Sequence, residues 1–208
     1  MATLREVKKR INAVVSTLLV MVFVIGICET SVRAQTEFGY GFKTGITMAK
    51  FWGDDVADAK FRNGFSGGGF FFADVSEQVR IQSEILYVTK GSNLEVGLDS
   101  HYSYLAFPLL FKFLIPTGGS VTPNLFIGGE IAYNLSAKLV NGVTFDIKEA
   151  ITDFDLGIVI GGELGFDTST GNFTIELRYT RGLRGLDDSG GGLDFKHNVI
   201  SMMIGFLN

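Results

Sequence analysis

Short stretches of alternating apolar and polar residues follow one another from Phe38 to the C-terminus, and this pattern constrains the fold more than any other feature of the chain. A two-residue period indicates β-strands, because successive side chains point to opposite faces of a sheet. No helical period competes with it, so we predict an all-β fold. Gly, Asp, Ser and Asn clusters separate eight predicted strands. They cover residues 38–52, 64–75, 79–90, 101–115, 122–135, 152–167, 173–183 and 195–207.

The connections between these strands alternate in length. Three are short, at 76–78, 116–121 and 168–172, and four are long, at 53–63, 91–100, 136–151 and 184–194. Outer-membrane barrels have short periplasmic turns and longer extracellular loops. We therefore predict an eight-stranded antiparallel up-and-down transmembrane β-barrel with both ends of the barrel sequence on the periplasmic side.

The N-terminal segment predicts export. Arg5, Lys8, Lys9 and Arg10 precede an apolar stretch at 11–27, and small residues flank Arg33. This is the layout of a secretory signal peptide, so we expect residues 1–34 to be cleaved after Ala34 and residues 35–208 to form the barrel domain. A retained membrane anchor is the alternative, because the apolar stretch approaches the length of a transmembrane helix. A lipoprotein site at Cys28 is disfavoured, because Ile27 stands where a small residue is needed.

Cleavage would change the charge and the thiol content of the chain. It removes five of the 18 basic and two of the 22 acidic residues, which leaves a net charge of −7. It also removes Cys28, the only cysteine, which suits an oxidising compartment. An acidic chain without a basic stripe argues against nucleic acid as a partner.

The two faces of each strand differ in polarity. In 173–180 the odd positions are apolar and the even ones are Thr, Glu, Arg and Thr. In 154–166 the same alternation holds with the apolar residues at the even positions. Leu105, Phe107, Leu109, Phe111 and Phe113 form another apolar row, with Pro108 and Lys112 on the opposite face. A soluble barrel would show the same alternation with the apolar face inside. The export signal and the aromatic residues near strand ends favour the membrane. These aromatic residues are Phe38, Tyr40, Trp52, Tyr102, Tyr133, Phe154 and Phe166.

Four phrases resemble those of the PorT-like small outer-membrane barrels, a porin family of Bacteroidota and related bacteria. The phrases are GFKTGIT at 41–47, QSEILYVTKG at 82–91, YLAFPLLFKF at 104–113 and ELRYTRGL at 176–183. The third is the most specific, and the similarity spans essentially the whole of 35–208. The resemblance implies an outer-membrane β-barrel. The founder of the family is linked to a protein secretion system, but the family is broad and that role does not transfer to this chain.

The inward faces bring together equal numbers of opposite charges. The predicted lumen network is Lys43, Arg80, Glu84, Lys112, Glu130, Glu163, Glu176 and Arg178. An eight-stranded barrel is just wide enough for side chains to fill, and buried charges persist when they are paired. We expect a closed ionic plug rather than a conducting pore or a proton path.

We find no motif that defines an enzyme, a cofactor site or a metal site. Asp99 and His101, and Asp187, Asp188 and His197, match no mechanism with a defined spacing. Acidic residues Asp54, Asp55 and Asp58 lack the Gly and Glu of a calcium loop. The glycines at 67–69 lie within a strand and not before a helix, so they are expected to allow close packing rather than to bind phosphate.

Three functions remain open at this stage. The first is a monomeric structural or interaction barrel in contact with outer-membrane lipid and with envelope or secretion-complex proteins. The second is a narrow channel or small-solute transporter. The third is a soluble periplasmic ligand-binding barrel.

Overall fold

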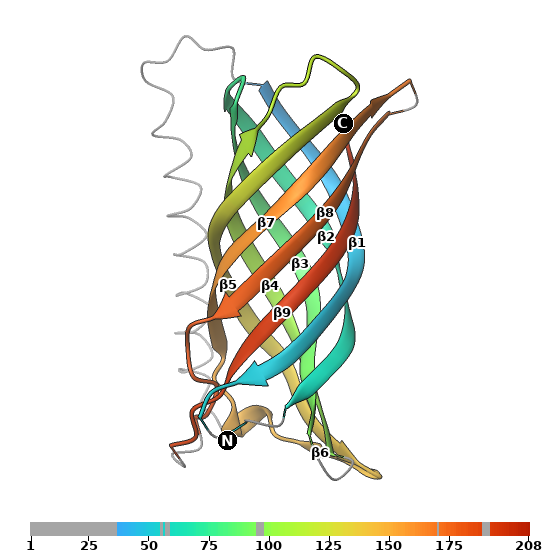
Figure 1. Cartoon of the computed structure of the whole chain (residues 1–208). Coiled ribbons are helices and arrows are strands. Elements are labelled where there is room, and N and C mark those ends of the chain that lie inside the picture. Colours follow the sequence, from blue (N-terminus) through green and yellow to red (C-terminus); the bar gives the residue numbers. More distant parts are fainter. Residues whose placement is uncertain (1–36, 55, 57–58, 95–97, 170, 189–191) are drawn as a thin grey trace, which may run out of the picture. The chain divides into compact units, whose positions relative to one another are not determined.

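Eight long antiparallel strands close into a barrel in the computed structural model (Figure 1). The structure describes residues 37–54, 56, 59–94, 98–169, 171–188 and 192–208, so the predicted signal peptide at 1–34 lies outside the described residues. The strands of the barrel are β1 (Glu37–Trp52), β2 (Lys60–Ser76), β3 (Val79–Leu94), β4 (Leu98–Leu114), β5 (Val121–Asn141), β7 (Phe154–Thr168), β8 (Gly171–Gly182) and β9 (Lys196–Leu207). A short strand, β6 (Val143–Asp146), and a 3-10 turn, η1 (Lys148–Ala150), lie between β5 and β7.

Each barrel strand pairs with its neighbours along the chain, and one further pairing closes the ring. β1 pairs with β9, so Gly41 faces Leu207 and Trp52 faces Lys196. β4 pairs with β5 and β5 with β7, and β6 pairs only with the end of β5. The predicted eight-stranded antiparallel barrel is confirmed. Among the described residues, no helix is long and apolar enough to cross a bilayer.

The two ends of the barrel differ in their connections. The short-turn end carries the start of β1, the end of β9 and the ends of the strand pairs β2–β3, β4–β5 and β7–β8. The long-loop end carries the opposite ends of these strands, with β6 and η1. We use these two names below.

Three of the four predicted long loops are wrong in part, because strand pairing continues beyond the alternating pattern. β2 starts at Lys60, within the predicted loop 53–63. β3 reaches Leu94 and β4 starts at Leu98, so most of 91–100 is hairpin. There the Ser100 hydroxyl accepts from the Ser92 N–H at 2.8 Å and donates to the Ser92 carbonyl at 2.9 Å. In 136–151, β5 extends to Asn141 and turns back through Gly142, with φ +67°, into β6. The hydrogen bonds of a hairpin join backbone groups, so strand pairing can extend beyond the residues that show the apolar alternation.

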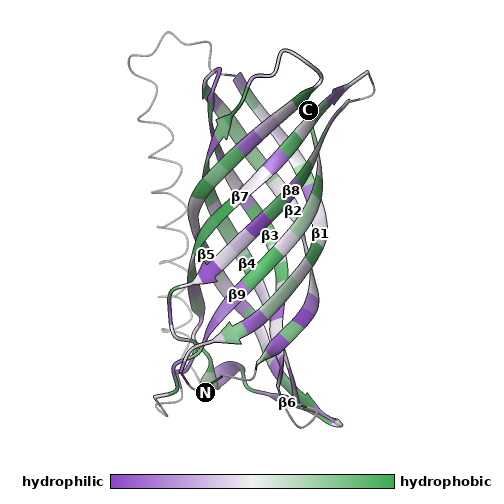
Figure 2. Ribbon diagram, in the orientation of Figure 1, coloured by the Kyte–Doolittle hydropathy of each residue, from purple (hydrophilic) through white to green (hydrophobic). Residues whose placement is uncertain are grey.

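The apolar side chains point outward over the wall of the barrel. Exposed fractions are 73% for Phe38, 67% for Phe42 and 61% for Leu177, whereas Glu176 and Arg178, on the opposite face of β8, are 1% and 2% exposed. Figure 2 shows hydrophobic and hydrophilic residues alternating along the strands. This is the membrane sense of the alternation, so the hypothesis of a soluble barrel is wrong. Of the aromatic residues expected at the interface, Tyr102 is a correction: it is 3% exposed and faces the lumen, because it has the inward parity of Tyr104.

The glycines at 67–69 lie in β2, where two strands approach closely. An ideal Cβ on Gly68 would lie 2.0 Å from the carbonyl oxygen of Ile85 in β3. Any side chain there would displace the backbone of β3. Gly68 therefore serves the close packing of β2 against β3.

Candidate functional site: the lumen

A four-membered ion network crosses the barrel at its centre. The Lys43 ammonium in β1 donates to Glu84 of β3 at 2.8 Å and to Glu176 of β8 at 2.7 Å. Arg178 donates to the same two carboxylates, at 2.8 Å to Glu84 and 2.7 Å to Glu176. All four side chains are at most 2% exposed. Each charge thus has two opposite partners, which is the arrangement that makes burial of ions tolerable.

A second group lies beside this network. Lys112 of β4 pairs with Glu163 of β7 at 2.9 Å, and Asn124 of β5 donates to the other oxygen of Glu163 at 3.0 Å. Gln82 lies two residues from Glu84 on β3 and donates to it at 2.6 Å. Side chains from several strands therefore span the lumen rather than lining it.

A third group contains residues that the sequence analysis did not place in the network. Lys90 of β3 donates to Glu130 of β5 at 3.0 Å and to Asp155 of β7 at 3.1 Å, and its side chain is 2% exposed. Lys90 is the last residue of the predicted strand 79–90, so it is not part of the predicted network, although its even number places it on the same inward face as Glu84. Asp155 lies on the polar face of its strand, but the sequence does not show which residue it pairs with, because that depends on the register between strands.

Arg80 lies apart from these groups. It forms a two-bond pair with Asp74 at 2.6 and 2.8 Å near the short-turn end, where the side chains are 15% and 21% exposed. Its guanidinium also stacks on Phe72, at 3.7 Å from the ring centre. The structure thus brings seven of the eight predicted residues into the interior groups and leaves Arg80 at the rim.

An aromatic layer fills the lumen toward the long-loop end. The rings of Phe51, Tyr102, Tyr104 and His197 pack with centroid distances of 5.3 to 6.4 Å. Tyr104 and His197 are also joined by a contact of 3.2 Å between the hydroxyl and Nε2. This layer therefore blocks the lumen with aromatic side chains on the long-loop side of the charged groups.

Two loops cover the lumen at the long-loop end, beyond the aromatic layer. Leu186, between β8 and β9, is 0% exposed, and Ile151, before β7, is 5% exposed. Backbone hydrogen bonds join the loops: Thr152 N–H donates to the Leu186 carbonyl at 2.9 Å, and Asp188 N–H donates to that of Ala150 at 3.0 Å. The loops are thereby tied to each other and to the barrel.

Little free space remains between the charged layers. One internal void has a volume of about 10 Å3 and is lined by residues that include Lys90, Glu130 and Arg178. A void of this size holds about one water molecule. It provides room for solvent but not for a solute.

The two histidines lie in different surroundings. His101 Nδ1 is 2.9 Å from the Arg62 guanidinium, and both residues are half-buried. His197 is 1% exposed, and its Nδ1 has no hydrogen-bond partner within the described part of the chain. Neither geometry is that of a histidine held by a carboxylate as a general base. Of the acidic loop, Asp55 and Asp58 lie outside the described residues; among those described, no group of three His, Cys, Asp or Glu residues is placed to hold a metal.

Comparison with known proteins identifies the family of this barrel. A family model described as an outer membrane protein beta-barrel domain matches residues 33–188. Among solved structures, Neisserial surface protein A is 11% identical with a TM-score of 0.51, over 80% of this chain and 96% of that one.

Two further structures are similar in fold. Ail, the attachment invasion locus protein of Yersinia pestis, is 15% identical with a TM-score of 0.48, over 83% and 99% of the two chains. OprG of Pseudomonas aeruginosa is 12% identical with a TM-score of 0.48, over 83% and 95%. No curated protein matches. Since the family model covers well over half of the sequence, this chain belongs to the outer membrane protein beta-barrel domain family and is a small barrel of the bacterial outer membrane.

Proposed function

We propose that this protein is a structural or interaction component of the cell envelope, with a lumen that is plugged and conducts no solute. The observation that carries the proposal is the pairing of Lys43 and Arg178 with Glu84 and Glu176 across the barrel. Opening a path would separate these pairs in a site with little water, and separating one buried partner costs about 3–5 kcal/mol. The aromatic layer and Leu186 would still block the long-loop end.

The plug argues against the narrow-channel alternative in a way that can be measured. We expect the protein purified from outer membranes to give no reproducible conductance steps in a planar bilayer, while a wide porin in the same bilayer does. Heat-modifiable gel mobility checks that the inserted protein is folded. Reproducible large steps from folded protein would overturn the plug and favour the channel.

The hairpin of β5 and β6 supports an interaction role. All four residues of β6 are exposed, and β6 projects from the long-loop end of the barrel (Figure 1). Its apolar residues Val143 and Phe145 are 62% and 58% exposed. Apolar side chains held on a projecting hairpin suit contact with a protein partner. A photo-crosslinker at Phe145 is expected to capture an envelope protein in intact cells, and the same probe at lipid-facing Leu177 is not. Equal adducts at both positions, or none at Phe145, would remove the interaction role.

The PorT-like resemblance makes secretion-complex proteins one class of partner to seek among these adducts. We further propose that the barrel acts as a monomer, carries no catalytic activity and is exported by cleavage after Ala34. A mature N-terminus at Gln35, determined by mass spectrometry, is the expected result for export. A retained N-terminus would instead favour the membrane anchor.

A further inference from the structure

The outward apolar band ends abruptly on three adjacent strands at the same register. Tyr179 of β8 faces Ile200 of β9, which faces Met48 of β1. One step further toward the long-loop end, Arg181 faces Asn198, which faces Lys50. The surface thus changes across these three strands from apolar residues to two basic residues and an asparagine.

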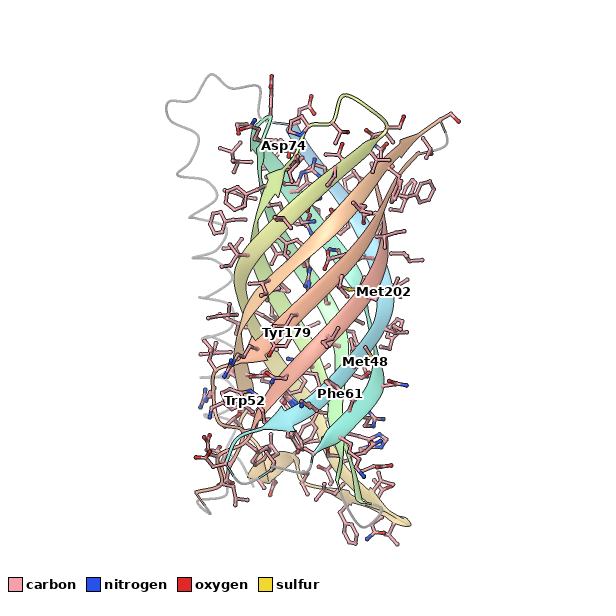
Figure 3. All side chains as sticks on the ribbon, in the orientation of Figure 1. Met48, Trp52, Phe61, Asp74, Tyr179 and Met202 are labelled. Carbon is pink, nitrogen blue, oxygen red and sulfur yellow. The ribbon has the colours of Figure 1, made fainter. Side chains whose placement is uncertain are left out.

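This boundary lies at the depth where lipid headgroups begin. On β1 the exposed apolar residues run from Phe38 to Met48. Ten residues at about 3.3 Å each, tilted by about 40°, span about 25 Å, which matches the apolar band of outer-membrane barrels. Lys50 and Trp52 then fall just beyond the acyl chains. Figure 3 shows Met202 and Met48 along the wall, with Trp52 nearer to the long-loop end.

Two cations stack on the only tryptophan of the chain. The Arg181 guanidinium lies 4.3 Å and the Lys196 ammonium 4.9 Å from the centre of the Trp52 ring. We call Lys50, Trp52, Arg181, Lys196 and Asn198 the Trp52 patch. Stacking on an indole orders long basic side chains before a ligand arrives, which lowers the entropic cost of binding.

The charges of the Trp52 patch are only partly neutralised by the protein. Lys196 pairs with Asp194. Lys50 lies 5.0 Å from the ring centre of Phe61, and neither Lys50 nor Arg181 forms an ion pair with any described residue. In the same patch the Trp52 indole N–H has no hydrogen-bond partner in the described part of the chain. The patch therefore has the positive charges of Lys50 and Arg181 to offer to an anion.

We propose that the Trp52 patch binds the phosphate of a phosphorylated lipid headgroup in the outer leaflet. Arg181 supplies planar, paired donors that match phosphate oxygens, and Lys50 adds a point charge from the neighbouring strand. The acyl chains of the same lipid lie against Met48, Ile200 and Tyr179. The inference rests on the membrane orientation predicted from the sequence, in which the long-loop end faces the outside.

Trp52 fluorescence tests the site directly, because no other tryptophan contributes. The protein is reconstituted in phosphatidylcholine vesicles with increasing fractions of bisphosphorylated lipid A. We expect a saturable change of Trp52 emission. Lipid A stripped of both phosphates is expected to give no saturable change, and an equal response to it would overturn the phosphate as the recognised group. Inorganic phosphate lacks acyl chains and is expected to leave the emission unchanged; an equal response to it would overturn a lipid as the occupant.

A matched pair of variants separates the patch from general surface charge. Lys50→Gln/Arg181→Gln is expected to raise the half-saturating lipid fraction by about tenfold. Lys60→Gln/Arg184→Gln removes two exposed positive charges at the same end of the barrel and is expected to leave it unchanged. Equal effects of the two double variants would overturn the patch as a site. Lys50→Arg retains the charge, is expected to bind as the wild type does, and keeps the test valid if the double variant fails the gel-mobility check. These results are independent of the conductance and crosslinking measurements that test the proposed function.

Discussion

Arg178 and Glu84 meet face to face in the lumen although 94 residues separate them in the chain. Two hydrogen bonds, of 2.8 and 2.9 Å, join the guanidinium to the two oxygens of the carboxylate. Since Glu84 also accepts from Lys43, one carboxylate bridges two buried cations, whose second partner is Glu176. The stability of the barrel therefore depends strongly on this residue.

Glu84→Gln is expected to lower the free energy of unfolding by about 3–5 kcal/mol, because it leaves Lys43 and Arg178 with too little negative charge in a buried site. Urea unfolding in lipid vesicles, followed by tryptophan fluorescence, measures the change. Glu77→Gln removes an exposed carboxylate in a short turn and is the control. A loss for Glu84→Gln no larger than that for Glu77→Gln would show that the network does not stabilise the fold.

Lys90→Met is expected to be destabilising by a similar amount, because Glu130 and Asp155 would remain as unpaired buried carboxylates. Adding Glu130→Gln and Asp155→Asn neutralises both and should restore much of the loss. Unfolding free energies of the single and triple variants give the comparison. A triple variant no more stable than Lys90→Met would contradict the charge-pairing account.

Leu177→Arg tests the direction of the apolar face. Leu177 is 61% exposed near the middle of β8, so an arginine there would stand in the hydrocarbon and cost about 2–4 kcal/mol. Leu183→Arg, at a residue 52% exposed beyond the end of β8, should cost about 0–1 kcal/mol. Unfolding in vesicles of both variants measures the difference. Equal costs would mean that Leu177 does not face lipid.

Leu186→Asp should release the loop between β8 and β9 from the barrel mouth, because a carboxylate cannot replace a fully buried apolar side chain. We expect faster tryptic cleavage after Arg184 in folded protein. Leu193→Asp changes an exposed residue of the same loop and is expected to leave the cleavage rate unchanged. If the two variants are cleaved at the same rate, Leu186 does not hold the loop in place.

The β5–β6 hairpin and the inward position of Tyr102 were both accessible to sequence reasoning. Asn141 and Gly142 between Val140 and Val143 form a dipeptide typical of tight hairpin turns. Tyr102 shares its parity with Tyr104 and Lys112, which lie on the inward face. The Asn-Gly pair indicates a turn and the parity of Tyr102 indicates an inward side chain. The polar surroundings of the one and the position of the other near a strand end instead favoured a loop and an interface residue.

The sequence by itself determined the strands, their number and the division of each strand into two faces, because the two-residue period is a local property of an extended backbone. Only the tertiary structure decided that Lys90 meets Asp155, that Arg80 stays at the rim and that Leu186 fills the mouth. Those contacts depend on the register and closure of eight strands, and inward residues far apart in the chain become neighbours only when the ring has closed.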